Sequence, residues 1–308
     1  MKKIYLLLFI LLFNSNLVAQ NKEQLTVLDN YYQKALDEWH IPGMAIAITT
    51  GDSIIFSKGY GYANLTKKSK VDANTLFAIA SNSKAFTSTS IAQLVEQKKI
   101  NWSDKAISYL PYYKLYNDYT TQNETIEDLL SHRNGLVTFG GDLLWYATTK
   151  TPEEIISAQQ YLKPKYDFRT HFGYSNIGFL SAGKVLEKVT DTSWATYVST
   201  HFLKPLKMNR TLTSTNQIKK TNNIATPYFY ENGKFNELKW VNWDNIAPAG
   251  ALISSVNDYA KWLQLNLNQG TLNGKTYYSK ETYNKLTSAH INLNVNPNDE
   301  KIHFKAYG

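Results

Sequence analysis

The sequence contains no cysteine, and that absence excludes several kinds of protein. Neither a disulfide bond nor a lipid-modified cysteine can hold or anchor the chain, so packing alone must stabilise the fold. The six histidines form no H-E-x-x-H pattern and no other paired ligand set. The sequence therefore predicts no metal centre, and it implies no cofactor.

Charge of one sign is not concentrated anywhere along the chain. The 33 lysines and arginines exceed the 25 acidic residues and give a formal net charge of +8, but they do not gather in a run. This distribution favours solubility, or loose attraction to an anionic envelope, over nucleic-acid binding. The sequence also lacks a phosphate-binding loop. Residues 270–276 are one residue short of the pattern G-x-x-x-x-G-K-[ST], and residues 59–64 lack the third glycine of a dinucleotide-binding fingerprint.

One unbroken apolar run opens the chain, and it is too short to cross a membrane. Residues 4–13 span ten positions, or about 15 Å of helix against a hydrocarbon core of about 30 Å. Two lysines precede the run and small residues near Ala19 follow it, which predicts a secretory signal peptide over residues 1–19. We expect an exported protein, periplasmic or secreted, with its mature domain over residues 20–308 and no membrane span after cleavage. An uncleaved membrane anchor is the alternative.

The composition allows one large core or two intertwined subdomains, since 43% of the 308 residues are hydrophobic and 19% are charged. No repeat or linker divides the chain. Apolar residues recur at steps of three and four over residues 22–39, which predicts an amphipathic helix. Two β-rich runs, residues 44–49 and 53–58, predict a hairpin. Gly59 and Gly61, which follow it, predict a strand end or a bulge.

Helical signals dominate the sequence after Phe77. Capping patterns mark three helix starts: T-I-E-D at Thr125, T-P-E-E at Thr151 and S-V-N-D at Ser255. Strands are scarce by comparison, and a lone hairpin is only marginally stable in water. We therefore expect the natural protein to continue past Gly308 and to supply further strands.

A candidate nucleophile and its base lie where the apolar run after Phe77 gives way to helical spacing. Ser81 precedes Lys84 by three residues, so the two side chains share a face of the helix start. A serine hydroxyl needs a base, and lysine becomes one only where burial or nearby positive charge lowers its pKa. The N–H groups of the helix start can also stabilise an oxyanion. Taken alone, the pair favours ordinary helix capping over catalysis.

A second polar group precedes the helix predicted over residues 177–189. Tyr174 and Asn176 lie in the Y-S-N sequence just before it, so a phenol and an amide can project from a loop into a cleft. A tyrosine can relay a proton when cations lower its pKa, and an asparagine can orient Lys84 and hold a substrate carbonyl. The alternative is a packing aromatic residue and a helix cap.

Together, S-x-x-K at a helix start and Y-S-N before a later helix resemble the serine β-lactamase and penicillin-binding-protein superfamily, in its class C β-lactamase-like, esterase-like branch. Further segments resemble that branch in the order in which it has them. These are the active-site helix after Leu76, the L-L-x-H-x-x-G-L element after Thr125, the P-L-K-M segment within residues 193–212, and the segment after Pro248. The resemblance extends over residues 42–265.

The resemblance implies a mixed α/β (α+β) fold of the β-lactamase/transpeptidase type, with a helical subdomain beside a mostly antiparallel sheet flanked by helices. It implies that Ser81 is acylated and that Lys84 takes or relays its proton. Tyr174 would protonate the leaving group and help activate the deacylating water, while Asn176 would bind the acyl side of the substrate. The implied substrates are β-lactams, D-alanyl peptides of the cell wall, or small esters and amides.

His132 and Gly135 also match a position of that branch. We interpret both as structural, because a single histidine needs a partner to perform chemistry. The expectation is a buried, hydrogen-bonded histidine beside a turn glycine.

The sequence departs from the family pattern in one respect. The family has a K-[ST]-G or H-x-G motif on a strand that closes the cleft, binds the substrate carboxylate and supplies the second oxyanion N–H. No such motif follows Asn176, since residues 274–276 have its residue types in the wrong order. A chain that continues past Gly308 would explain both the missing motif and the missing C-terminal strands. The alternative is a non-catalytic, penicillin-binding-like protein of the cell envelope.

Overall fold

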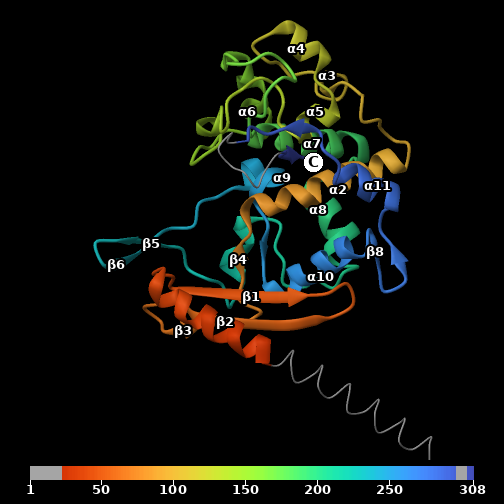
Figure 1. Cartoon of the computed structure of the whole chain (residues 1–308). Helices are drawn as coiled ribbons and strands as arrows, with labels where there is room; N and C mark the ends of the chain where they lie inside the picture. Colours follow the sequence, from red (N-terminus) through yellow and green to blue (C-terminus); the bar gives the residue numbers. More distant parts are fainter. Residues whose placement is uncertain (1–22, 296–303) are drawn as a thin grey trace, which may run out of the picture.

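A computed structural model describes residues 23–295 and 304–308 of the chain (Figure 1). The predicted signal peptide, residues 1–19, lies outside the described residues. The first described element is a helix over residues 23–38, which confirms the amphipathic helix predicted from the apolar spacing. No helix among the described residues is both long enough and apolar enough to span a bilayer.

The predicted hairpin forms the largest sheet. Strand β1, Gly43–Thr49, pairs antiparallel with β2, Ile54–Asn64, and the short β3, Ser69–Lys70, pairs with the other edge of β2. The order is β1-β2-β3, so β1 is an edge strand within the described part of the chain. The hairpin prediction is confirmed, although β2 continues past the predicted end of its strand.

The prediction of a strand end or a bulge is wrong for Gly59, whereas Gly61 has a φ of +67° and lies at the last β1–β2 pair, next to a register shift between Tyr62 and Asn64. Both lie inside β2, where Gly59 pairs with Ala45 and Gly61 pairs with Gly43. The glycines are required by crowding, because a Cβ atom at Gly59 would lie 2.4 Å from the carbonyl oxygen of Val71. Close approach of a neighbouring backbone is a second use of glycine within a strand.

Helices make up most of the remaining regular structure. They are α2 (Ser83–Glu96), α3 (Ala106–Tyr109), α4 (Asp118–Asn123), α5 (Ile126–Ser131), α6 (Pro152–Ala158), α7 (Asn176–Thr190), α8 (Trp194–Val198), α9 (Ala247–Gly250), α10 (Val256–Leu267) and α11 (Lys280–Leu286). Thr125 and Thr151 each form a complete capping box, and the Ser255 side chain accepts a hydrogen bond from the N–H of Asp258. The three helix starts predicted from capping patterns are confirmed.

Helix α2 lies between two clusters of buried apolar side chains. Ile91 and Leu94 pack into the cluster that α5 and α7 share, while Phe86 packs into the cluster that includes Trp262 of α10. In Figure 1, α2 accordingly runs through the middle of the molecule, with α3 to α7 on one side and α10 with the sheet on the other. The start of α2, and with it the turn that carries Ser81 directly before it, lies between the two halves.

Short strand pairs complete the structure. They are β4 (Phe77–Ala78) with β7 (Ile253–Ser254), β5 (Tyr228–Glu231) with β6 (Lys234–Glu237), β8 (Thr271–Leu272) with β9 (Lys275–Thr276), and β10 (Ile291–Asn292) with β11 (Ala306–Tyr307). All of these pairs are antiparallel. The arrangement of helices around antiparallel sheets confirms the predicted mixed α/β class.

Candidate active site

Ser81 is held at the junction between a strand pair and α2. It lies in the 3₁₀ turn η1, Ala80–Asn82, directly after β4 and before α2. Ala80 adopts a φ of +44°, which an L-residue with a side chain adopts only at a cost of about 1–3 kcal/mol. The Ser83 hydroxyl holds this conformation, because it donates to the carbonyl of Ala80 at 2.7 Å and accepts from the N–H of Leu252 at 3.0 Å. The nucleophile candidate therefore lies on a strained and fully supported turn.

Lys84 lies one helical turn from Ser81 and is buried. Its Nζ lies 3.2 Å from the Ser81 Oγ, and it donates to the Asn176 Oδ1 at 2.7 Å and to the carbonyl of Ala249 at 2.9 Å. Burial lowers the pKa of Lys84 to about 7, although the nearby charge of Asp142 acts in the opposite direction. A large fraction of the lysine is therefore neutral near pH 7 and able to accept a proton.

Tyr174 is the second residue that contacts the Ser81 hydroxyl. Its hydroxyl donates to the Ser81 Oγ at 2.6 Å, and the Lys84 Nζ lies 4.8 Å from the centre of its ring. Burial raises the pKa of Tyr174, although the hydrogen bond to Ser81 acts to lower it. The phenol is therefore protonated at neutral pH, which suits a proton donor better than a first base.

Asn176 is the first residue of α7, and both ends of its amide are occupied. Its Oδ1 accepts from Lys84, and its Nδ2 donates to both carboxylate oxygens of Asp142, at 3.1 and 3.0 Å. The structure thus brings the four residues selected from the sequence into one hydrogen-bonded group. The geometry places Asn176 as a partner of Lys84; the substrate-binding role expected for it stays a prediction.

His132 is buried beside this group, as the sequence predicted. It is 1% exposed, and its Nδ1 accepts a hydrogen bond from the N–H of Ser175 at 3.0 Å, while its ring stacks on that of Tyr174. Burial, with a smaller contribution from the charge of Lys84, lowers the pKa of His132 to about 3. The neutral ring therefore supports the loop that carries Tyr174, and Gly135 nearby adopts a φ of +92°.

Two members of the site were not found from the sequence. Asp142 begins the 3₁₀ turn Asp142–Leu144, and Ala249 in α9 offers only its backbone carbonyl. Ala249 has no polar side chain to mark it, and Asp142 follows two glycines that indicate a turn and nothing more. Both join the site through tertiary contacts.

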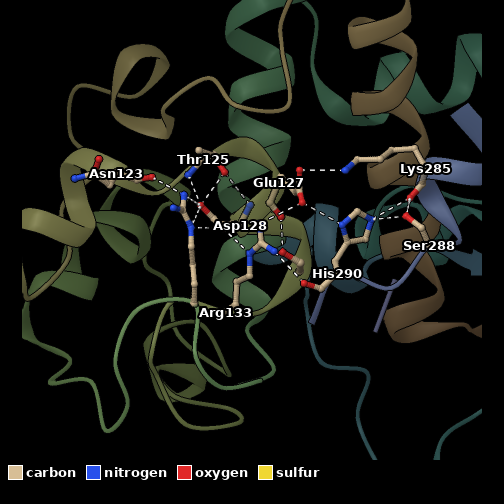
Figure 2. A network of polar contacts seen from close by, with 10 residues as sticks. Asn123, Thr125, Glu127, Asp128, Arg133, Lys285, Ser288 and His290 are labelled. Atoms are coloured by element: carbon tan, nitrogen blue, oxygen red, sulfur yellow. Dashed lines mark hydrogen bonds and ion pairs between the residues drawn. The ribbon is translucent and has the colours of Figure 1, made fainter. Parts of the chain in front are cut away.

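A cavity of about 480 Å³ opens beside the site. Ser81, Lys84 and Tyr174 line part of its wall, and Lys285 and His290 line another part. Figure 2 shows these last two side chains pointing toward Glu127 of α5, which the Lys285 Nζ contacts at 3.1 Å and the His290 Nδ1 at 3.1 Å. The site can therefore admit a small substrate next to the Ser81 hydroxyl.

Comparison with known proteins defines the class. The family model described as Beta-lactamase matches residues 28–294, and the chain belongs to this family. This chain superposes with a TM-score of 0.76, at 25% identity, on the structure of a penicillin-binding protein homologue from Pyrococcus abyssi that is described as octameric. It superposes with a TM-score of 0.70, at 27% identity, on the structure of FmtA from Staphylococcus aureus. The match to the first structure covers 87% of this chain and 61% of that chain, and the match to FmtA covers 85% of this chain and 69% of the FmtA chain. The predicted family and the β-lactamase/transpeptidase-like fold are confirmed.

Curated relatives agree with this assignment. The chain is 31% identical over 242 residues to the unguisins hydrolase ungD' of Aspergillus campestris, and 29% identical over 249 residues to protein flp of Staphylococcus aureus. These matches cover 75% and 78% of this chain but 45% and 48% of the relatives. The chain thus spans about half the length of the curated relatives it matches.

Proposed function

We propose that this chain provides the nucleophile and the proton-transfer groups of an exported serine hydrolase that works through an acyl-enzyme on Ser81. The observation that supports this most directly is the placement of a buried lysine, with its pKa lowered to about 7, and of a protonated tyrosine within hydrogen-bonding distance of one serine hydroxyl. The family membership of the chain supports a serine hydrolase in general. The proposed substrates are β-lactams, D-alanyl peptides or small esters and amides.

Acylation follows from the hydrogen bonds of the site. Neutral Lys84 has two N–H donors for its two acceptors, Asn176 and Ala249, which leaves its lone pair for the Ser81 proton. As the Ser81 Oγ bonds to the substrate carbonyl carbon, its proton passes to the Lys84 Nζ. When the tetrahedral intermediate collapses, the bond to the leaving group breaks and Tyr174 donates a proton to that group; Lys84 returns a proton to Tyr174.

Deacylation uses the same groups with water in place of the leaving group. Water attacks the acyl carbonyl carbon and gives its proton to the neutral Lys84 amine, directly or through the Tyr174 hydroxyl, which passes its own proton on; the Ser81 Oγ leaves and recovers a proton from Lys84. The backbone N–H of Ser81 would supply one oxyanion donor. Export to the periplasm or beyond belongs to the same proposal and is supported by the signal-like sequence of residues 1–19.

The test is acylation of the purified chain by a fluorescent penicillin and by p-nitrophenyl acetate, compared with Ser81→Ala and Lys84→Arg. We expect an adduct on Ser81, seen by intact mass, that Ser81→Ala lacks. The rate of acylation should rise with pH through about 7, because Lys84 accepts a proton only when it is neutral. Lys84→Arg should lose about 100-fold or more, since arginine stays protonated.

Equal labelling and turnover in the wild type and in Ser81→Ala would contradict the proposal. Binding of peptidoglycan fragments that survives Ser81→Ala, without any adduct in the wild type, would instead support the non-catalytic envelope protein. That reading is favoured by one observation, which is that no K-[ST]-G or H-x-G motif follows Asn176 in this sequence.

A further inference from the structure

Asp142 is the charged residue nearest to the Lys84–Asn176 pair that neither the sequence motifs nor the proposed mechanism uses. Its two carboxylate oxygens accept from the Asn176 Nδ2, and its Oδ1 also accepts from the indole Nε1 of Trp145 at 2.9 Å. Trp145 is only 5% exposed, and Gly141 before the turn adopts a φ of +94°. A Cβ atom at Gly141 would lie 2.7 Å from the Leu162 side chain, so the turn is packed tightly in place.

We propose that Asp142 is a positioning residue for acyl transfer: through Asn176 it fixes the amide so that the lone pair of Lys84 remains available to Ser81, and its charge helps set the protonation of that lysine. The inference rests on the proposed function. It adds a residue with a defined effect on the reaction, at a position that no motif marks.

The orientation of the Asn176 amide is the first part of the argument. With Oδ1 toward Lys84, the amide accepts from the lysine whether the lysine is charged or neutral. In the flipped orientation the Nδ2 group would face Lys84 and could donate to the lone pair of the neutral amine, which would occupy the lone pair that Ser81 needs. The flipped amide would also turn its oxygen toward the Asp142 carboxylate. Two acceptors facing each other repel, so Asp142 disfavours the unproductive orientation.

The charge of Asp142 is the second part. Tyr174, His132 and Asp142 are titratable groups beside Lys84, and Glu127, Lys285, His290 and Tyr307 line the same cavity. Besides burial, the charge of Asp142 is what acts on the pKa of Lys84. Tyr174 is protonated at neutral pH and His132 is neutral there, since burial moves the pKa of each away from neutrality. Asp142 is therefore the negative charge that opposes the effect of burial on Lys84. Without it, Lys84 would lose its proton at lower pH and would be a weaker base.

The experiment compares the wild type with Asp142→Asn and Asp142→Ala. Asparagine keeps an acceptor for Trp145 and for Asn176 but removes the charge, whereas alanine removes both. Asp104→Asn is the matched control, because Asp104 also accepts from an aromatic side chain, the Tyr109 hydroxyl, and makes no contact with the site. Acylation by a fluorescent penicillin and by p-nitrophenyl acetate is followed from pH 5 to 10, with thermal unfolding as the measure of folding.

In both Asp142 variants we expect the acidic limb of the acylation profile to move to lower pH. The limiting rate should fall about 10- to 100-fold in Asp142→Ala, the size of effect that misplacement of a reacting group produces, and less in Asp142→Asn. Binding of the probe before acylation should change little. Asp104→Asn should keep the wild-type profile.

Titration of Lys84 provides a readout that does not depend on activity. Lysine labelled with ¹³C at Cε, assigned with Lys84→Arg, should titrate at lower pH in Asp142→Asn than in the wild type. If folded Asp142→Asn has the wild-type lysine titration, the inference is wrong, whatever the acylation data show. If the wild type is never acylated but the titration moves, the proposed function fails while the electrostatic link between Asp142 and Lys84 stands.

Discussion

Glu124, at the end of α4, is an acidic residue placed where a charge is unfavourable. It is 1% exposed, its Oε2 accepts from the Tyr113 hydroxyl at 2.5 Å, and its Oε1 has no partner among the described residues. Burial raises the pKa of Glu124 to about 8, although the hydrogen bond from Tyr113 acts to lower it. The folded protein therefore holds this carboxyl in its neutral form at pH 7.

The stability of the protein should fall as the pH rises toward 8 because of this residue. The unfolded chain loses the Glu124 proton near pH 4.5, whereas the folded chain keeps it until about pH 8. Between these values the unfolded state binds fewer protons, which reduces the free energy of unfolding by up to about 1.4 kcal/mol per pH unit. Below pH 4.5 the contribution is complete, and above about pH 8 it is lost. Glu124→Gln should remove this dependence.

Urea unfolding at pH 5, 6, 7 and 8 measures the effect. The stability of Glu124→Gln relative to the wild type should increase with pH over this range, whereas the exposed Glu281→Gln should show a constant difference. A constant difference for Glu124→Gln as well would mean that Glu124 is ionised in the folded protein at neutral pH.

At the same scale, the sequence allowed the prediction of residues that carry a motif. Ser81 and Lys84 have helical spacing, and Tyr174 and Asn176 lie at the start of α7, so local order brings each pair together. Asp142 gave no such signal, because its contact with Asn176 joins residues 34 positions apart. Shifts in pKa were equally unpredictable, since they depend on burial.

Among the elements, α5 is attached to its neighbours by an ionic network. Asp128 is buried, and its carboxylate accepts from Arg133 at 2.5 Å and from Arg169 at 2.6 Å (Figure 2 shows Asp128 and Arg133). Burial alone would raise the pKa of Asp128, but hydrogen bonds from Arg169 and from Thr125 more than offset it, so the pKa lies below its usual range. The carboxylate thus both caps α5 and connects it to the loop before α7.

Asp128→Asn should therefore destabilise the protein strongly. Loss of the carboxylate charge removes the ion-pair partner of Arg169, whereas Arg133 keeps its ion pair with Glu127. Breaking a buried ion pair in this way costs about 3 kcal/mol or more. The measurement is urea unfolding at pH 7, with the exposed Asp118→Asn of α4 as the control, expected to change stability by less than about 0.5 kcal/mol. A similarly small change for Asp128→Asn would show that the arginines find equivalent partners in water.

Helix starts were the elements that the sequence predicted best. A capping box is made by residues three positions apart, so Thr125 and Thr151 carry the whole signal locally. The extent of β2 was missed for the opposite reason. Gly59 indicates a break when only its neighbours in sequence are considered, yet it is required by the backbone of Val71, which comes close only in the folded sheet.

For the molecule as a whole, the position of α2 between two cores was not visible in the sequence. Helix α2 presents buried residues on several sides, including Phe86, Ile91 and Leu94. Apolar spacing predicts that such a helix is buried but not which elements surround it. This arrangement joins the helical half of the molecule to the half that contains the sheet, and it has a consequence for cooperativity.

Phe86→Ala should weaken both halves together. The Phe86 ring is fully buried and stacks on Trp262 with centroids 3.9 Å apart, so its removal should cost about 3–5 kcal/mol. Because α2 also carries Ile91 and Leu94 of the other cluster, amide exchange in Phe86→Ala should accelerate by the same factor in α7 and in α10. The control is Leu267→Ala, at an exposed position of α10, which should leave the exchange rates of both helices unchanged. Hydrogen exchange followed by mass spectrometry resolves the two helices. Faster exchange in α10 alone would mean that the halves unfold independently, and that α2 does not couple the two cores that hold Ser81 in place.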